Sequence, residues 1–387
     1  MTSTAHSAPD RTPRDGTPRV LFACGGTGGH VYPAIAIADA VRAARPGAAV
    51  AFAGTRDRME WTAVPKAGYP IHAVTVSGFQ RGLSGEALRR NATFAVKLGR
   101  GIVEAWRLVG AFDADVVVGT GGYVSGPVGL AGVLRGRRLV IQEQNAIAGA
   151  TNKLLARRAD RVFVGFEAAL ADLPAASVSG NPVRADLVAA SATDETRAAA
   201  RAELGIDAQA DVLLVTGGSL GARALNAAVE ANLGTLLANP RAVVVWAAGT
   251  RFYDALRASA PVHDRLHLVP YLDRMDLAYA SATLAIARAG ALTCSELAAT
   301  GTPAVLVPSP NVTADHQTRN AAALARAGAA VLLPEARLAA EFGTLVPRLL
   351  HDAQALAAMR AATASVARPD AARTIADAVV ALAETPR

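Results

Sequence analysis

The feature that most constrains the fold is a repeated alternation of short apolar runs, glycine-rich turns and alanine-rich stretches. In the first half of the chain the apolar runs lie at residues 19–23, 49–54, 115–122, 138–144 and 161–166. In the second half they lie at residues 211–219, 242–249, 266–271, 282–290 and 303–308. Strands that alternate with helices in this way form parallel β-α-β units. The sequence therefore predicts an α/β protein with a parallel sheet in each half.

Chain length and one polar segment divide these units into two domains. A chain of 387 residues exceeds what a single hydrophobic core holds. The dipeptide Asn181-Pro182 opens a polar, strand-free segment that extends to residue 200, and turn signals of this kind mark boundaries between elements. We place the domain junction within this segment, with Asn181-Pro182 as the hinge.

Three predicted strands end in adjacent glycines. Gly25-Gly26-Thr27 and Gly217-Gly218-Ser219 each follow a strand and precede a helix, and a third such corner lies at residues 119–127. The first two corners make the halves resemble each other, as two nucleotide-binding domains that face a cleft. Bare backbone lets a ligand approach closely, and the amides at a helix start favour phosphate. The alternative is a tight turn whose glycines serve only packing.

Known nucleotide motifs restrict what these corners bind. The first corner has Val31 where the dinucleotide motif requires its third glycine, which disfavours NAD. No glycine loop continues into the Gly-Lys-Ser/Thr of a P-loop. Residues 217–221 match the G-x-S-x-G elbow of serine hydrolases, with Glu296 and His316 in the chain order of a triad. A hydrolase that uses Ser219 therefore stays open as a remote alternative.

The segment Asp113-Ala114-Asp115 matches the D-x-D with which many glycosyltransferases hold a cation. It precedes a predicted strand, whereas ligands of parallel sheets bind at the carboxyl edge. We interpret it as a solvated loop between a helix and a strand.

Composition limits the partners and the cellular compartment that we expect. The formal charge of +7 favours anionic partners, although charge alone does not choose among them. The two cysteines indicate neither a disulfide framework nor a thiolate metal site, which is typical of a reducing, cytoplasmic compartment. The first 17 residues lack the apolar core of a signal peptide.

Several motifs together resemble one family. They occur in this order: GGTGGHVYPAIAIA, GTGGYVSGP, QEQNAIAGATNKLLA, SGNPVR, TGGSLGARALN, RAGALTCSELAATGTPAVLVP and ADHQTRNA. From residue 19 to about residue 335 the chain is similar to the bacterial UDP-N-acetylglucosamine:undecaprenyl-pyrophosphoryl-MurNAc-pentapeptide N-acetylglucosaminyltransferases, which form lipid II in peptidoglycan synthesis. The resemblance implies a fold of the glycosyltransferase B type and an inverting transfer that forms a β-1,4 bond.

The resemblance also implies how the chain is divided. We expect a disordered tail at 1–17, an acceptor and membrane domain at 18–183, a UDP-sugar domain at 184–364, and a C-terminal helix at 365–387 that packs back on the first domain. The implied partners are UDP-GlcNAc, the undecaprenyl-linked muramyl-pentapeptide and an anionic membrane surface, without nucleic acid. No metal cofactor is implied, because the amides and the helix start at Ser219 would stabilise the leaving diphosphate.

Site residues follow from the family's motifs, position by position. Ser219 would contact the diphosphate, Glu296 the ribose, Leu272 the uracil and Gln317 the sugar hydroxyls. The remaining donor contacts implied are Thr27, Gly28, Gly29, Asn145, Arg184, Gly218, Ala291, Leu292, Thr293, Cys294 and Ser295.

The general base is implied less directly. His30, at the helix start, is the preferred candidate, because the positive helix end disfavours its cationic form. Glu143 is the rival base, and Tyr123 would contact the acceptor. Many relatives carry His at the position of Gln142, so arguments for Glu143 that need that neighbour are weakened.

A basic, amphipathic segment at residues 78–110 predicts the membrane contact. Leu88, Ala95, Leu98, Ile102 and Ala105 recur at helical spacing and should face the core. An interfacial surface would then comprise Phe79, Arg81, Leu83, Phe94 and Trp106 with further basic residues. A helix with an ordinary solvated face is the alternative. The predicted location is the cytoplasmic face of the membrane, as a peripheral protein.

Two other functions stay open beside the hydrolase. One is a transferase of the same fold that acts on another lipid or a natural product. The other is an inactive module that binds a sugar nucleotide or a membrane without turnover.

Overall fold

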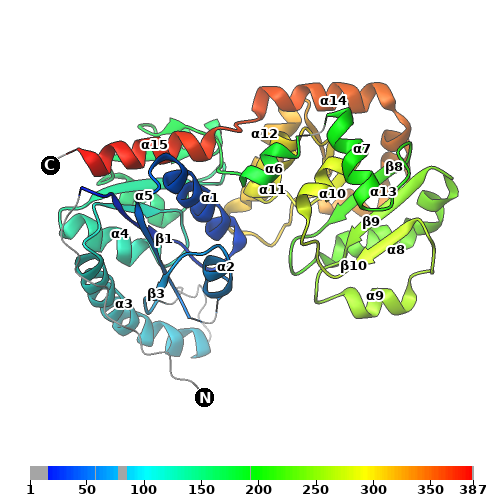
Figure 1. The fold of residues 1–387 in the computed structure, drawn as a ribbon. Coiled ribbons are helices and arrows are strands. Elements are labelled where there is room, and N and C mark those ends of the chain that lie inside the picture. Colours follow the sequence, from blue (N-terminus) through cyan, green and yellow to red (C-terminus); the bar gives the residue numbers. More distant parts are fainter. Residues whose placement is uncertain (1–15, 57, 77–84, 192, 386–387) are drawn as a thin grey trace, which may run out of the picture. The chain divides into compact units, whose positions relative to one another are not determined.

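The computed structural model describes residues 16–56, 58–76, 85–191 and 193–385, without the side chains of 85–96 and 313. The chain forms two compact units (Figure 1). The first comprises Met1–Gln144, Ala148–Pro182 and Asp370–Arg387, and the second comprises Asn145–Ile147 and Val183–Pro369. The passage at Pro182 to Val183 lies beside the predicted hinge, whereas the inclusion of Asn145–Ile147 in the second unit was not predicted.

The first unit is a seven-stranded parallel sheet in the order β3-β2-β1-β4-β5-β6-β7. Its strands are β1 (Arg19–Ala23), β2 (Ala49–Gly54), β3 (Ile71–Ala73), β4 (Val116–Gly119), β5 (Arg138–Glu143), β6 (Arg161–Val164) and β7 (Ser177–Val178). Its helices are α1 (Gly28–Ala44), α2 (Glu60–Lys66), α3 (Gly85–Phe112), α4 (Ser125–Leu134), α5 (Ala150–Ala156), the short 3₁₀ turn η1 (Glu167–Ala171) and α15 (Ala371–Glu384).

Helices cover both faces of this sheet. Successive residues of each strand point to opposite faces, and the apolar residues on both faces need cover. Val20 and Phe22 of β1 pack with α1 and α15, whereas Leu21 and Ala23 pack with α3 and α4. Helix α15 lies along α1, as the red and blue ribbons of Figure 1 show. Of the C-terminal helix expected at 365–387, Ala371–Glu384 packs in the core of the first unit, whereas residues 365 and 366 still belong to α14 of the second unit.

The second unit repeats the strand order of the first. Its sheet runs β10-β9-β8-β11-β12-β13, from β8 (Asp211–Thr216), β9 (Ala242–Ala247), β10 (Leu266–Val269), β11 (Leu284–Ala287), β12 (Ala304–Leu306) and β13 (Ala330–Leu332). Its helices are α6 (Ala185–Ala189), α7 (Asp194–Glu203), α8 (Arg223–Ala238), α9 (Tyr253–Ser259), α10 (Met275–Ser281), α11 (Ala291–Thr300), η2 (Thr313–Asp315), α12 (His316–Arg326), α13 (Glu335–His351) and α14 (Ala353–Val366). Strands β1 and β8 thus occupy the same place in two sheets, which confirms the predicted fold class of two parallel-sheet domains.

Three strands were not predicted, namely β3, β7 and β13. Each has three residues or fewer and lies at a sheet edge. Short edge strands carry too little periodic pattern to be recognised from sequence.

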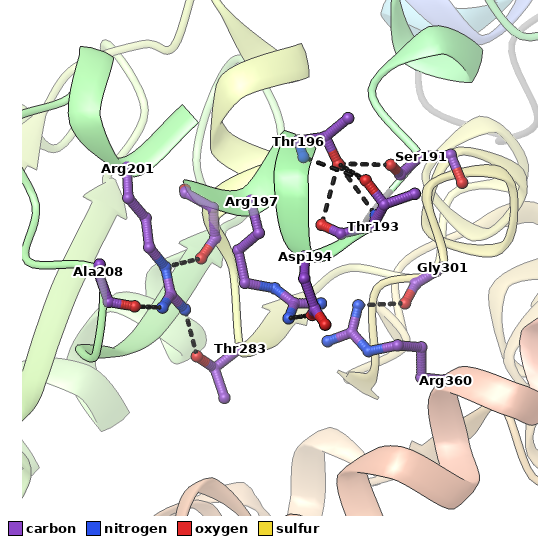
Figure 2. A network of polar contacts seen from close by, with 11 residues as sticks. Ser191, Thr193, Asp194, Thr196, Arg197, Arg201, Ala208, Thr283, Gly301 and Arg360 are labelled. Carbon is purple, nitrogen blue, oxygen red and sulfur yellow. Dashed lines mark hydrogen bonds and ion pairs between the residues drawn. The ribbon is translucent and has the colours of Figure 1, made fainter. Parts of the chain in front are cut away.

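Polar contacts fix α7 to the second sheet. Thr193 caps the helix in a reciprocal pair with Thr196, and Figure 2 shows this cap beside three arginines. Arg201 is buried and donates to the Ser281 and Ala208 carbonyls and to the Thr283 hydroxyl. This cluster lies at the amino edge of the sheet, because Thr283 directly precedes β11.

The helix register predicted for the basic segment is partly wrong. Ala105 is buried as expected, but Leu98 is 36% exposed. The buried stripe instead runs through Gly101, Ala105, Val109 and Phe112. It passes through Gly101 because a Cβ there would lie 2.2 Å from the Thr75 carbonyl oxygen, so α3 approaches the backbone of the first unit at this point. Among the described residues no helix combines the length and apolarity needed to cross a bilayer.

Candidate functional site

The glycine corners lie at equivalent positions of the two sheets. In each sheet the strand order reverses between the first and the fourth strand, at β1/β4 and at β8/β11. Ligands of such sheets bind outside the carboxyl ends of the strands at this switch point. The corner after β1 faces the one after β4 in the first unit, since a Cβ on Gly122 would lie 2.2 Å from the Gly25 carbonyl oxygen.

A buried carboxylate organises the corner after β1. Glu60, at the start of α2, is fully buried. Its Oε2 accepts from the Gly26 amide at 3.1 Å, and its Oε1 accepts from the amide and the hydroxyl of Thr55 at 3.0 and 2.6 Å. Gly25 is needed here because a Cβ would lie 2.8 Å from Glu60 Oε1. The chain thus supplies its own hydrogen-bond acceptor to this corner.

His30 is held by two acceptors on one side of its ring. Its Nδ1 lies 3.1 Å from the Thr120 carbonyl oxygen and 2.8 Å from Gln144 Oε1. The Thr120 hydroxyl in turn donates to the His30 carbonyl at 2.8 Å. Gly121 must be glycine, because a Cβ would lie 2.6 Å from Nδ1 and the backbone φ is +108°. The corner at residues 119–127 therefore positions the imidazole of His30.

Thr27, Gly28 and Gly29 form the entry to α1. Thr27 is the N-cap residue without a side-chain cap, and no acidic residue lies in the first turn of the helix. Its carbonyl accepts from the His30 amide at 3.0 Å. This hydrogen bond closes the first turn of α1, which contains Gly28 and Gly29.

Glu143 is buried and engaged with its own loop. It is 2% exposed, and its Oε2 accepts from the Gly149 amide at 2.9 Å and from Asn152 Nδ2 at 2.8 Å. These contacts hold the start of α5. Glu143 therefore has a structural role that does not depend on catalysis.

The corner after β8 has the opposite character. Gly218, Ser219 and Leu220 are exposed, and a turn is closed by the Gly221 amide, which donates to the Gly218 carbonyl at 2.9 Å. Within the described residues, the amides of Ser219 and Leu220 have no protein acceptor. Helix α8 then starts with no side-chain cap and no acidic residue in its first turn. This corner therefore presents free donors and a positive helix end to a ligand.

Close backbone contact fixes this second corner. A Cβ on Gly221 would lie 2.1 Å from the Ala248 carbonyl oxygen, and one on Gly249 would lie 2.2 Å from the Gly221 amide nitrogen. Buried Asn226 donates to the Ala248 carbonyl at 2.8 Å and accepts from Trp246 Nε1 at 3.0 Å. The loop is thus held by the Ala248 backbone, while Gly218, Ser219 and Leu220 stay exposed.

Glu296 lies at the middle of α11, the helix that follows the corner after β11. Its Oε2 accepts from the Tyr279 hydroxyl at 3.0 Å. Burial raises the pKa of Glu296, and the Tyr279 hydrogen bond and the charge of Arg184 partly oppose this shift. Arg184 itself pairs with Asp186 at 3.0 Å. Of the two Glu296 oxygens, one is held by the protein, as is suitable for a carboxylate that orients a ligand through the other.

The remaining expected donor residues fall around the same edge of the second unit. Gln317 Oε1 accepts from the Ser309 amide at 2.8 Å and so shapes the loop before α12. Leu272 is half-buried in the loop after β10. Residues Ala291, Leu292, Thr293, Cys294 and Ser295 form the first turns of α11, which has no acidic residue in its first turn.

Asn145 belongs to this second unit. Buried Asn320 donates to Asn145 Oδ1 at 3.4 Å and accepts from the Ala146 amide at 2.9 Å. Asn320 also donates to the Ala289 carbonyl at 3.2 Å, in the corner after β11.

The expected acceptor and membrane residues are described only in part. Tyr123 is 63% exposed at the corner after β4, and Trp106 is 46% exposed on α3. Phe79, Arg81 and Leu83 lie outside the described residues, as does the side chain of Phe94.

Two alternative sites are not built by this structure. Among the described residues no hydrogen bond joins Ser219 to an imidazole, and Glu296 is bonded to Tyr279 rather than to a histidine. The D-x-D carboxylates are engaged before β4, since Asp115 accepts from the Arg19 amide at 2.9 Å and Asp113 pairs with Arg137 at 2.8 Å. The motif is a loop between a helix and a strand as predicted, but it is only partly solvated, because Ala114 is buried and both carboxylates are half-buried.

Sequence reasoning missed the residues that support the site. Glu60, Thr120, Gln144, Tyr279 and Asn320 each contact a predicted site residue or its corner. Gln144 and Asn320 lie inside recognised motifs, QEQN and ADHQTRNA, and could have been found there. Glu60 and Tyr279 carry no local signal.

Two parallel-sheet units, each with a glycine corner at its switch point, have the architecture of the glycosyltransferase B fold. Family models support this class over both units. The description "Glycosyltransferase family 28 N-terminal domain" matches residues 20–164, and "Glycosyltransferase family 28 C-terminal domain" matches residues 212–375. The chain belongs to glycosyltransferase family 28.

Two similar proteins carry the same name. A protein of Salinibacter ruber, named "UDP-N-acetylglucosamine--N-acetylmuramyl-(pentapeptide) pyrophosphoryl-undecaprenol N-acetylglucosamine transferase", is 54% identical over 95% of this chain and 97% of its own length. A Chlorobium limicola protein of the same name is 42% identical over 94% of this chain and 99% of its own length. The crystal structure of Acinetobacter baumannii MurG superposes with a TM-score of 0.72 at 31% identity, covering 94% of this chain and 99% of that one.

Proposed function

We propose that this enzyme transfers GlcNAc from UDP-GlcNAc to the 4-hydroxyl of MurNAc in undecaprenyl-pyrophosphoryl-MurNAc-pentapeptide, with inversion to a β-1,4 bond. The observation that carries the proposal is the pair of free amides at Ser219 and Leu220, before the uncapped start of α8. A diphosphate is the group that such a corner accepts. The name shared by the relatives supplies the sugar and the acceptor.

On the donor side, we propose that Gly218 and Ser219 bind the diphosphate and Glu296 binds the ribose hydroxyls. Leu272 packs beside the uracil, and Gln317 and Asn145 bind the sugar. The first turns of α11 complete the donor site, and Arg184 offers positive charge near Glu296.

On the chemical step, we propose His30 as the general base. The acceptor hydroxyl attacks the anomeric carbon while the bond from that carbon to the β-phosphate oxygen breaks. The hydroxyl proton passes to Nε2 of His30, and UDP leaves with its charge stabilised by the corner amides and the α8 start. Glu143 is the weaker candidate because its Oε2 already accepts two hydrogen bonds.

No metal ion held by a D-x-D is part of this proposal. The amides and the helix end supply positive potential where other transferases place a cation. The transfer is therefore expected to continue in the presence of a chelator.

We further propose that the first unit binds an anionic bilayer surface through α3 and α4. Val103, Trp106 and Leu134 are exposed there. The Arg135 guanidinium lies 3.5 Å from the centre of the Trp106 ring, and Lys97 and Arg107 are exposed on α3. Exposed apolar side chains beside cations are typical of interfacial surfaces.

One assay tests the reaction. Radiolabelled UDP-GlcNAc is incubated with the lipid-linked muramyl acceptor in the presence of EDTA, and UDP and glycosylated lipid are measured. We expect equal amounts of both. Consumption of the donor with another aglycone but not with this acceptor would instead assign a different transferase of the same fold.

A second assay tests the membrane surface. Sedimentation with vesicles that contain anionic lipid should exceed that with neutral vesicles and should fall with added salt. Trp106→Ser should weaken it, whereas the exposed Val262→Ser, in the second unit, should not. Equal binding by both variants and the unchanged protein would refute this part.

A further inference from the structure

A series of hydrogen-bonded, buried polar side chains connects His30 to Asn181, where the polypeptide leaves the first unit. Thr120, Gln142, Gln144 and Asn181 are all at most 2% exposed. They come from the ends of β4 and β5 and from the residue before Pro182. Buried amides of this kind must be hydrogen-bonded, and each one constrains the orientation of the next.

Backbone carbonyls fix the direction of every bond in this series. Asn181 Nδ2 donates to the Gln144 carbonyl at 3.0 Å, so its Oδ1 accepts from Gln142 Nε2 at 2.9 Å. Gln142 Oε1 then accepts from Gln144 Nε2, which also donates to the Thr120 carbonyl at 2.6 Å. Gln144 Oε1 is left as an acceptor toward His30.

This direction determines the tautomer of His30. Both atoms near its Nδ1, Gln144 Oε1 and the Thr120 carbonyl oxygen, are acceptors. The neutral ring therefore carries its proton on Nδ1 and its lone pair on Nε2. A base that takes a proton from a hydroxyl needs this free lone pair.

Neutral amides surround the ring in place of a carboxylate. Two carboxylates of the same unit accept from other groups, Glu143 from Gly149 and Asn152, and Glu60 from Gly26 and Thr55. Among the described residues no carboxylate is hydrogen-bonded to the His30 ring. The ring is thus oriented by neutral acceptors.

Asn181 is fitted closely into this arrangement. A Cβ on Gly165, directly after β6, would lie 2.2 Å from Asn181 Oδ1. Since Pro182 follows and the second unit starts at Val183, the last member of the series lies at the passage between the units.

We propose that Gln144 is a positioning residue that sets the Nδ1–H tautomer of His30, and that Gln142 and Asn181 hold Gln144 in the required orientation. The kinetic part of this inference rests on the proposed role of His30 as base. The tautomer itself does not depend on that role.

Nitrogen NMR tests the tautomer directly. The protein is labelled with 15N-histidine, and long-range 1H–15N spectra are recorded at a pH where histidine is neutral. The His30 signals are identified by their loss in His30→Gln. We expect a protonated Nδ1 in the unchanged protein and a larger Nε2–H fraction in Gln144→Met and Asn181→Ala, because only the Thr120 carbonyl at 3.1 Å then remains as an ordered acceptor for Nδ1–H. The exposed Gln209→Met serves as the matched control.

Kinetics supply the second readout. Gln144→Met should lower kcat at least ~10-fold, as a wrong tautomer does in other histidine bases, with the KM for UDP-GlcNAc within about twofold. Gln144→Glu keeps an oxygen acceptor beside Nδ1, although it loses the hydrogen bonds that Nε2 donates, and should restore part of kcat. It should also move the acidic limb of the kcat/KM profile to higher pH, because a carboxylate beside Nδ1–H stabilises the protonated ring.

The outcomes separate the two claims. An unchanged tautomer in Gln144→Met, or an Nε2–H tautomer in the unchanged protein, overturns the positioning role. A tautomer that shifts while kcat stays normal upholds the positioning role and removes His30 as base. If Gln144→Met does not fold, the spectrum and pH profile of Gln144→Glu decide, and an unmoved acidic limb would contradict the proposal.

Discussion

The two corners after β1 and β8 share a motif and a place in the sheet but differ in what occupies them. In the first unit, Glu60 accepts from the Gly26 amide. In the second, Ser219 and Leu220 are exposed and their amides meet no acceptor within the described residues. We therefore expect an anion site only at the corner where no carboxylate of the protein accepts from the glycine amides.

The first residues of helices α1 and α8 also differ between the two corners. Helix α1 begins with two glycines and then His30, whose ring is held by neutral acceptors. Helix α8 begins with exposed Arg223, whose guanidinium lies 5.7 Å from the centre of the Phe252 ring. On this account the first corner accepts a proton and the second accepts diphosphate charge.

The largest expected effect comes from removing the imidazole of the first corner. His30→Ala should lower kcat by about 10²- to 10⁴-fold, the usual contribution of a general base, while UDP affinity measured by calorimetry stays within about twofold. His351→Ala, on the exposed end of α13, is the control. A His30→Ala enzyme with near-normal single-turnover rates would remove the assignment.

Distortion of the second corner should instead weaken donor binding. In Gly221→Ala the new Cβ would lie 2.1 Å from the Ala248 carbonyl oxygen at a φ of +75°, so the loop must move. We expect UDP affinity to fall by more than ~10-fold, since strain of this kind costs about 1–3 kcal/mol or more.

Gly234→Ala is the matched control for that loss. Gly234 lies within α8 and has open space around its Cα. This variant should gain about 0.5–1 kcal/mol in free energy of unfolding and keep UDP affinity. Equal UDP affinity in Gly221→Ala would mean that the loop does not bind the diphosphate.

A smaller effect should follow from giving the second corner an anion like that of the first. Leu220 is 71% exposed, so Leu220→Glu can be accommodated without repacking. Its carboxylate should compete with and repel the diphosphate, which we expect to weaken UDP binding about 5- to 10-fold at low salt and less at high salt. Leu220→Gln should stay within about twofold, and no difference between the two variants would contradict the comparison.

Glu296→Gln should give the smallest change in binding but a distinct pH dependence. Burial raises the pKa of Glu296, so its carboxylate protonates earlier than usual as the pH falls. UDP affinity of the unchanged protein should therefore decline in mildly acidic buffer, whereas that of Glu296→Gln should be a few-fold lower and independent of pH.

Glu296→Gln should weaken UDP binding but raise the stability of the folded protein at neutral pH. A raised carboxyl pKa means that the folded state binds the proton more tightly, so stability is lost as pH rises through the folded pKa. Glu296→Gln should therefore melt at a higher temperature than the unchanged protein at neutral pH, with the difference closing in acid. A lower melting temperature at neutral pH would refute this.

Much of the framework could be predicted from sequence because it is encoded locally. The glycine corners follow apolar runs that form central strands, and parallel strands bring their carboxyl ends to one edge. What was missed depends on distant partners. Glu60 reaches Gly26 from α2, and Tyr279 reaches Glu296 from α10, so neither residue is marked by its neighbours in the chain. The register of α3 failed for a related reason, since Gly101 is buried by its approach to Thr75.

The most direct test of the division between the two corners is a crystal structure of this protein with bound UDP. The account predicts that the diphosphate oxygens lie within hydrogen-bond distance of the Ser219 and Leu220 amides. Diphosphate oxygens bound instead at Thr27, Gly28 and Gly29 would contradict it.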